Sequence, residues 1–206
     1  MLPDLTALLG SRICHDLISP LGAIGNGVEL LTLADAAQGP EIALISESVH
    51  SANARIRFFR IAYGASSEGQ RVARSEIASI LADLYGGARL AIDWQAAGDP
   101  ARDDVKLLFL LIQCLETALP FGGTVTADRI DGVWPVVGTS PKLRADPALW
   151  DGFRSAAARP GNAPPEAWAG SITSALVHFA LVPDSLRKIK ATLAIEMDEA
   201  TITFRF

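Results

Sequence analysis

Apolar residues recur at helical spacing over the first part of the chain. Between residues 3 and 36 they step by three or four positions, the pattern of a helix packed against other helices. The members of this first apolar seam are Ile13, Leu17, Leu21, Ile24, Val28 and Leu31. Between residues 40 and 65 the steps alternate between three and four, which predicts a second long helix with a heptad seam. The members of this second seam are Ile42, Ile45, Val49, Ala52, Ile56, Phe59 and Tyr63.

A short link at residues 36–40 joins the two predicted helices. It contains a glycine suited to ending a helix and a proline suited to starting one. Two helices joined by so short a link must lie antiparallel as a hairpin. A lone hairpin of about 40–50 Å would leave apolar surface uncovered. We therefore expect a homodimer in which two hairpins form a four-helix bundle.

The pattern changes after a polar break, rich in glycine and serine, at residues 64–70. We take it as the boundary between a hairpin of residues 1–66 and a second domain of residues 70–206. The predicted helices of this domain cover residues 75–85, 105–119, a short segment from 147, and 167–180, with a proline-rich loop at 159–165. The predicted strands cover residues 89–95, 124–130, 133–137, 191–197 and 201–206, with Asp131-Gly132 as a hairpin turn. This order predicts an α+β fold, a sandwich of helices on one mixed sheet.

His15 faces away from the first apolar seam. At about 100° per residue it lies roughly 160–200° from most seam residues, so its imidazole is expected in solvent. The residues that share its face are polar or small: Ser11, Arg12, Ser19, Gly22 and Asn26. Asp16 is placed to accept the proton of Nδ1 and leave Nε2 free as a nucleophile. Pro20 removes a backbone hydrogen bond and bends the helix one turn beyond the histidine.

Other interpretations of this histidine stay open at this point. A lone histidine on a helix is most often an ordinary surface residue, which is what we expect of His50 and His178. The Cys14-His15 pair suggests redox or metal chemistry, and His15-Asp16 suggests a metal-dependent phosphohydrolase. Neither pattern is accompanied by the further ligands that such a site needs.

The composition narrows the class of protein. Of 206 residues 50% are hydrophobic and 20% charged, which suits a well-buried globular fold. The net charge of −5 and the lack of a basic run argue against nucleic acid as a partner. We expect no membrane association, because no apolar stretch reaches the roughly 18–20 residues of a span and no signal peptide is evident. The two cysteines form no disulfide framework, so a cytoplasmic protein with reduced thiols is expected.

Residues 15–21, HDLISPL, resemble the H-box of sensor histidine kinases. In that family the histidine carries phosphate on a dimeric helical hairpin, and an ATP-binding domain follows. The order of elements is similar here over nearly the whole chain. The resemblance implies that His15 is the phosphoacceptor, Asp16 its acidic neighbour and Ser19 the small polar residue one turn on.

The ATP-binding motifs of those kinases are missing from the second domain. Gln113 and Thr117 stand where asparagines are expected, the D-x-G-x-G motif is absent after Val133, and GSITSALVHFA at residues 170–180 replaces the glycine-rich lid. Without these groups the backbone cannot approach a nucleotide and the metal loses a ligand. The chain therefore resembles the alphaproteobacterial histidine phosphotransferases of the ChpT type, whose kinase-like ATPase domain is degenerate.

This resemblance implies a phosphotransferase of a multistep phosphorelay, in a pathway that regulates the cell cycle. His15 would carry a phosphoryl group from the receiver aspartate of a hybrid histidine kinase of the CckA type. The acceptors would be the receiver aspartates of response regulators of the CtrA and CpdR types. No cofactor is expected in this chain, because the Mg²⁺ belongs to the partner receiver. An ATP-dependent histidine kinase and a non-catalytic receiver-binding scaffold are the alternatives.

Further residues of the H-box helix are assigned to this site. Arg12 and Ser19 are expected beside the transition state, together with His15 and Asp16. The residues expected to contact a receiver are Ser11, Ile18, Gly22 and Asn26. Each glycine inside this helix costs about 1 kcal/mol relative to alanine. Either close packing in the bundle or the close approach of a partner must offset that cost.

Overall fold

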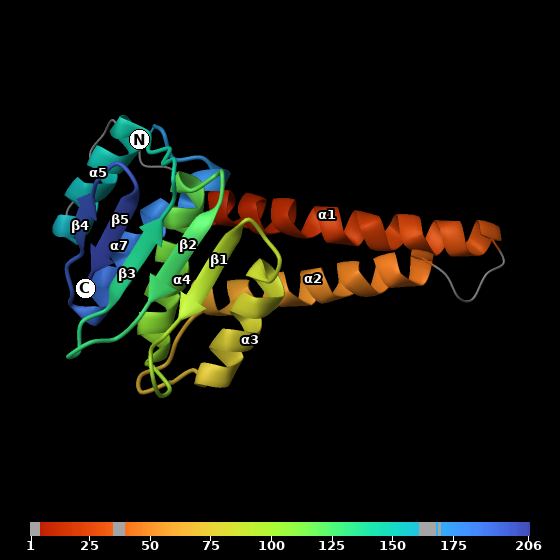
Figure 1. Ribbon diagram of the computed structural model, residues 1–206, viewed down its shortest axis with the longest axis horizontal. Helices are drawn as coiled ribbons and strands as arrows, with labels where there is room; N and C mark the ends of the chain where they lie inside the picture. The colour runs from red at the N-terminus through yellow and green to blue at the C-terminus, as the bar shows by residue number, and fades with distance from the viewer. Residues whose placement is uncertain (1–4, 35–39, 161–167, 169) are drawn as a thin grey trace.

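The computed structural model describes residues 5–34, 40–160, 168 and 170–206. Its N-terminal part is a hairpin of two helices, α1 (Leu5–Ala34) and α2 (Pro40–Ala62), which projects from a mixed α/β body (Figure 1). Both predicted helices are confirmed. Residues 3–4, at the start of the first predicted helix, and most of the predicted link lie outside the described residues.

The body is built on one five-stranded sheet of order β1-β2-β3-β5-β4. Its strands are β1 (Leu90–Trp94), β2 (Gly123–Ala127), β3 (Pro135–Thr139), β4 (Ala194–Met197) and β5 (Thr201–Arg205). β1 and β2 pair in parallel and the other neighbours pair antiparallel, so the sheet is mixed, as predicted. Its helical elements are α3 (Arg74–Tyr85), α4 (Arg102–Ala118), α5 (Pro147–Ala158), the 3-10 turn η1 (Ser174–Leu176) and α7 (Val177–Ile189).

The core lies between the sheet and α4, which runs behind the sheet together with α7 in Figure 1. Residues 107–112 of α4 are all fully buried, because the sheet covers one side of the helix and α2 and α7 cover others. The ring of Phe58 in α2 stacks on that of Phe109 in α4, with centroids 4.5 Å apart. The end of the hairpin is therefore part of the core of the body.

Local turn chemistry explains several element boundaries. Asp131 and Gly132 both have positive φ, and Ile130 and Val133 exchange two backbone hydrogen bonds of 2.9 Å across this turn. This is the geometry of a two-residue hairpin, so the predicted turn is confirmed. At the start of α5, Asp146 accepts a hydrogen bond from the backbone N–H of Leu149 at 2.9 Å and caps the helix.

The bounds predicted for the last helix are wrong. A helix was predicted over residues 167–180, of which residues 167 and 169 lie outside the described residues. Of the described residues in that range, 174–176 form the turn η1, and α7 begins at Val177 and continues to Ile189. Pro183 favours an earlier end, because a proline inside a helix removes one backbone hydrogen bond. The helix continues through it because Val182 and Leu186 are fully buried in the core.

The apolar seams of the hairpin are only partly covered within one chain. Of the residues of the first seam, on α1, Leu21 is 58% exposed and Val28 is also exposed. On α2 the exposed seam residues repeat every seven positions: Ile42, Val49 and Ile56. The predicted homodimeric bundle would cover these side chains, and it stays a prediction. Within the described residues, no helix is long and apolar enough to cross a membrane.

The end of α2 is fastened to α4 by cationic side chains. The guanidinium of Arg102 donates to the carbonyl of Arg60, and the Nζ of Lys106 donates to the carbonyl of Gly64 at 3.1 Å. Cations at the C-terminal end of a helix satisfy its last carbonyls and complement its dipole. The hairpin and the body therefore meet through specific contacts, while the division at residues 64–70 stays a prediction.

Candidate functional site

His15 projects into solvent from α1, and its side chain is 84% exposed. Its Nδ1 lies 3.0 Å from Oδ1 of Asp16. Because a carboxylate only accepts hydrogen bonds, Nδ1 carries a proton in this arrangement, and the neutral form of this tautomer has its lone pair on Nε2. The outward orientation inferred from the helical pattern is confirmed. The site therefore presents an exposed imidazole whose Nδ1 is bonded to a carboxylate and whose Nε2 is the ring nitrogen left for a partner.

Asp16 is held from two sides. One oxygen accepts from His15, and the other accepts from Nε of Arg12 at 2.8 Å. The side chain of Asp16 is only 9% exposed, so this carboxylate has little freedom to turn. An imidazole bonded to a fixed carboxylate is oriented in the way that nucleophilic and general-base sites require.

Arg12 lies beside Asp16 and reaches toward the body. Besides its bond to Asp16, its Nη1 donates to the backbone carbonyl of Ala175 at 3.1 Å. The sequence places Arg12 on the same helical face as His15. In the structure its guanidinium bonds the carboxylate of Asp16 and the backbone of η1. A signal for the contact with Ala175 is absent from the sequence, because the two residues are 163 positions apart.

The other residues predicted for this face are exposed. Ser11, Ser19, Gly22 and Asn26 lie open on α1, and Ile18 is the most exposed of the large apolar side chains described. A Cβ added at Gly22 would meet no atom within 4 Å. Packing inside one chain therefore does not require a glycine there.

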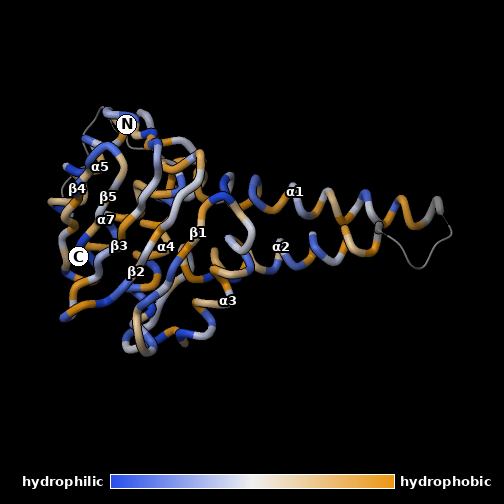
Figure 2. Tube along the Cα trace, viewed as in Figure 1, coloured by the Kyte–Doolittle hydropathy of each residue, from blue (hydrophilic) through white to orange (hydrophobic). Residues whose placement is uncertain are grey.

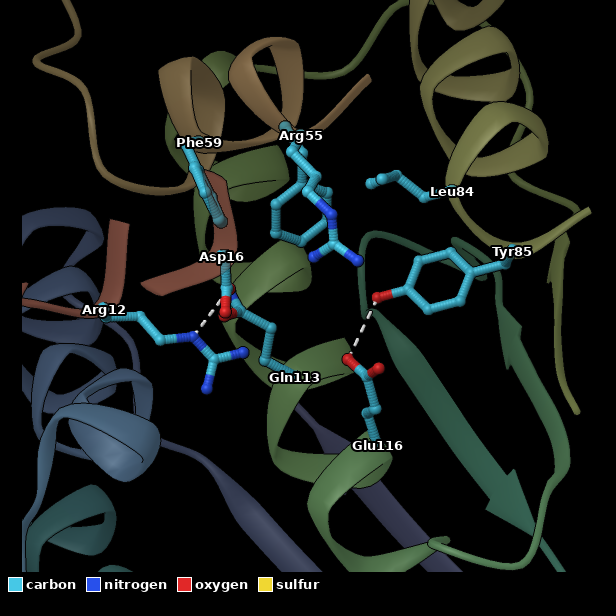
Figure 3. A pocket seen from close by; sticks show the side chains of 9 residues that line it. Arg12, Asp16, Arg55, Phe59, Leu84, Tyr85, Gln113 and Glu116 are labelled. Atoms are coloured by element: carbon cyan, nitrogen blue, oxygen red, sulfur yellow. Dashed lines mark hydrogen bonds and ion pairs between the residues drawn. The ribbon is translucent and has the colours of Figure 1, made fainter. Parts of the chain in front are cut away.

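A cleft opens where the hairpin meets α3 and α4 (Figure 3). Arg12 and Asp16 line it from α1, and the opposite wall contains Arg55, Tyr85 and Glu116. The hydroxyl of Tyr85 donates to Glu116 at 3.3 Å, and burial raises the pKa of both groups. The Nε of Arg55 is buried without a hydrogen-bond partner in the described structure. Sequence reasoning missed this wall because its residues come from three separate elements.

Gln113 and Thr117 stand where asparagines are expected in the kinases, and both side chains make hydrogen bonds within the fold. The amide oxygen of Gln113 accepts from the hydroxyl of Tyr63 at 2.7 Å. The hydroxyl of Thr117 donates to the backbone carbonyl of Gln113 at 3.0 Å and contacts Nε2 of His178 at 3.2 Å. Because the one hydroxyl proton goes to the carbonyl, Nε2 of His178 is the donor to Thr117. These contacts tie α4 to Tyr63, just after α2, and to α7.

The helices of the body differ in hydropathy from the outer part of the hairpin. Figure 2 shows mostly hydrophobic residues along α4 and α7, whereas the outer parts of the hairpin alternate between hydrophobic and hydrophilic positions.

His178 is buried at the junction of α4 and α7, and burial lowers its pKa to about 3. His50 lies on the surface of α2 and pairs with Asp83. His50 is an ordinary surface residue, as expected. The same expectation is wrong for His178, because α7 packs against α4 and buries its side chain.

We expect the stability of the fold to fall as the pH is lowered through the unfolded pKa of His178. That pKa is 6.5 in an unperturbed histidine and about 3 in the fold. Below pH 6.5 His178 is therefore protonated in the unfolded chain but stays neutral in the folded chain. The free energy of unfolding then falls by about 1.4 kcal/mol per pH unit. Urea unfolding at about pH 7 and about pH 5 should show a difference near 2 kcal/mol from this residue.

His178→Gln serves as the reference for this measurement, because a glutamine side chain has no titration in this range. The raised pKa of Glu116 acts in the opposite direction and is common to both proteins. An equal pH dependence in wild type and His178→Gln would rule out the buried neutral histidine as its source.

A metal site is not evident in the part of the chain that the structure describes. No group of three or more histidine, cysteine, aspartate or glutamate side chains there is arranged to hold a metal ion. Cys14 is exposed and Cys114 is buried, and both are free thiols.

The fold and the site together define a two-part protein, in which a histidine-bearing helical hairpin is joined to a mixed α/β domain. The chain belongs to the family described as Histidine phosphotransferase C-terminal domain, whose model matches residues 74–201. It is 39% identical over 131 residues to the Protein phosphotransferase ChpT of Brucella abortus (strain 2308). That match covers 63% of this chain and 62% of the relative's length. The resemblance to phosphotransferases of the ChpT type is therefore confirmed.

A solved structure agrees over the full chain. The structure described as "1.7 Angstrom Structure of a Bacterial Phosphotransferase" superposes with a TM-score of 0.76 and 28% sequence identity. The alignment covers 100% of this chain and 99% of that chain. The hairpin and the body are therefore found together in a phosphotransferase of known structure.

Proposed function

We propose that this chain is a histidine phosphotransferase of a multistep phosphorelay in the cytoplasm. His15 accepts a phosphoryl group from the receiver aspartate of a hybrid histidine kinase and passes it to the receiver aspartate of a response regulator. The observation that carries this proposal is the exposed imidazole whose Nδ1 is fixed on Asp16. The family match and the phosphotransferases similar to this chain support the same function.

The transfer is a single displacement at phosphorus. The lone pair of His15 Nε2 forms a bond to the phosphorus of an aspartyl phosphate, the bond to the aspartate oxygen breaks, and the receiver carboxylate leaves. The imidazole gains positive charge as this bond forms, and Asp16 stabilises it through the proton on Nδ1. Transfer to a response regulator is the same reaction in reverse. The Mg²⁺ that offsets the phosphoryl charge belongs to the receiver, so no cofactor is proposed for this chain.

ATP is not a substrate in this proposal. Gln113 and Thr117, at the positions of the kinase asparagines, make hydrogen bonds with Tyr63 and His178. Because each of these two side chains is bonded to another side chain of the fold, both positions serve internal packing. This supports a phosphotransferase over the alternative of an ATP-dependent histidine kinase.

The receiver contacts are proposed for the exposed face of α1. Ser11, Ile18, Gly22 and Asn26 are exposed on α1 along the stretch that carries His15, and Ser19 lies one turn beyond the histidine. An exposed large apolar side chain next to small residues suits the docking of a partner element. A scaffold that only binds receivers would use the same face, but it would have no need of the bond between His15 and Asp16.

The proposal is tested by supplying phosphate from a receiver alone. Receiver domains from the hybrid kinases of the same organism are charged with radiolabelled acetyl phosphate, freed of the reagent and mixed with the chain without nucleotide. Label should move to the chain from at least one of these receivers and be lost in acid, as phosphohistidine is. If label stays on every receiver while each still binds the chain, the scaffold alternative holds and the phosphotransferase proposal fails.

We further propose that two chains form a homodimer through the open seams of the hairpin. Leu21→Glu would place a charge on the apolar surface that the dimer buries, so we expect this variant to elute as a monomer. Light scattering should give twice the 21.8 kDa chain mass for the wild type. Ile130→Glu is the matched control, because Ile130 is equally exposed but lies far from the hairpin seams. A monomeric wild type would contradict this proposal.

A further inference from the structure

One run of hydrogen bonds links the body of the protein to the imidazole of His15. The carbonyl of Ala175 accepts from Nη1 of Arg12 at 3.1 Å. Nε of Arg12 donates to Oδ2 of Asp16 at 2.8 Å, and Oδ1 of Asp16 accepts from Nδ1 of His15 at 3.0 Å. Arg12 and His15 donate in this run, and the Ala175 carbonyl and the Asp16 carboxylate accept.

The two middle members of the run are shielded from solvent. Arg12 is 22% exposed and Asp16 is 9% exposed, and both point into the cleft between the hairpin and the body (Figure 3). Charge-assisted hydrogen bonds are strong, and shielding from water strengthens them further. The orientation of the Asp16 carboxylate therefore depends on where Arg12 is held.

The body holds Arg12 at its far end. Ala175 belongs to η1, in the segment of residues 170–180 that stands where the related kinases have a glycine-rich lid. Arginine can serve both contacts at once, because its fork presents Nε and Nη1 in fixed directions. A lysine in this place has a compact ammonium group and cannot match both directions.

We propose that Arg12 is a positioning residue, which acts on His15 through Asp16 and is itself held by the body at Ala175. It keeps the proton of His15 on Nδ1 and the lone pair on Nε2. This inference rests on the proposed function, since it concerns the same histidine. It gives the second domain a part in phosphotransfer that needs no nucleotide, because the segment in place of the lid now sets the state of the nucleophile.

The test compares Arg12→Lys with the wild type by two measurements that need no partner. Nitrogen chemical shifts report which ring nitrogen of His15 carries the proton, and potassium phosphoramidate, a direct chemical donor, phosphorylates His15 without a receiver. We expect Arg12→Lys to move the proton population toward Nε2 and to slow labelling of His15 by up to about 10²-fold, the size of effect that a misplacement of about 1 Å can produce. Peptide mapping separates label on His15 from label on His50.

Arg60→Lys is the matched control. Arg60 also forms an ion pair, with Glu76, but on the exposed surface between α2 and α3. It should leave both measurements as in the wild type. Should Arg12→Lys unfold, Arg12→Gln takes its place, since a glutamine amide can donate to Asp16 without reaching Ala175.

The inference is overturned if a folded Arg12 variant keeps the wild-type proton position and labels within twofold of the wild-type rate. A purely structural role would lower the melting temperature and leave the proton on Nδ1. Because phosphoramidate replaces the receiver, this result is independent of whether transfer from a receiver occurs. The inference and the proposed function can therefore fail separately.

Discussion

Replacing His15 with alanine is expected to abolish transfer of phosphate from a receiver to this chain. The phosphoryl group must form a bond to Nε2, and the alanine variant has no atom there to accept it. The variant should fold normally, because the imidazole is exposed and its contact in the structure is with Asp16. The measurement is the transfer of label from a phosphorylated receiver, followed on a gel over time.

His50→Ala is the matched control for this prediction. Like His15, His50 is exposed and bonds a carboxylate, with its Nε2 3.1 Å from Asp83. Its loss should leave the rate of transfer unchanged, because its surroundings have no place in the proposed reaction. Equal acceptance of phosphate by the wild type and His15→Ala would contradict the assignment of the nucleophile.

Replacing Asp16 with asparagine is expected to slow the same transfer by about 10²–10⁴-fold. An amide is close to a carboxylate in shape, so Arg12 and His15 can still lie beside it. It carries no charge to stabilise the imidazolium that forms during transfer, and it does not hold the proton on Nδ1 as a carboxylate does. Rapid-quench measurement of the transfer rate, with the melting temperature recorded beside it, tests this prediction.

Asp83→Asn provides the comparison for Asp16→Asn. It removes the carboxylate from the pair that Asp83 makes with His50 and costs some stability through Arg57, but it lies outside the proposed site. The transfer rate should stay near that of the wild type. A rate for Asp16→Asn within twofold of the wild type would mean that the bond to Nδ1 has no part in the chemistry.

The sequence predicts the elements that depend on local chemistry. Asp131-Gly132 correctly predicts a hairpin turn, and Asp146-Pro147 correctly predicts the start of a helix. Each feature is made by residues close together in the chain. The two long helices follow from periodicity over many residues, which a few exceptions do not obscure. The outward direction of His15 follows from the same periodicity, since a helix fixes which residues share a face.

Tertiary contacts account for what the sequence does not predict. Pro183 lies inside α7 because buried neighbours on that helix outweigh one lost backbone hydrogen bond. The partner of Arg12 is a backbone carbonyl far along the chain, and a carbonyl has no sequence signature. The cleft wall formed by Arg55, Tyr85 and Glu116 likewise exists only once α2, α3 and α4 are packed together.

The most direct measurement compares the two possible sources of phosphate on His15. The chain is incubated with radiolabelled ATP and Mg²⁺, alone and together with a hybrid histidine kinase that carries a receiver domain. A kinase variant without its receiver aspartate serves as the control. The account predicts label on the His15 peptide only with the intact kinase, and none with the variant. Labelling of His15 from ATP alone would contradict it.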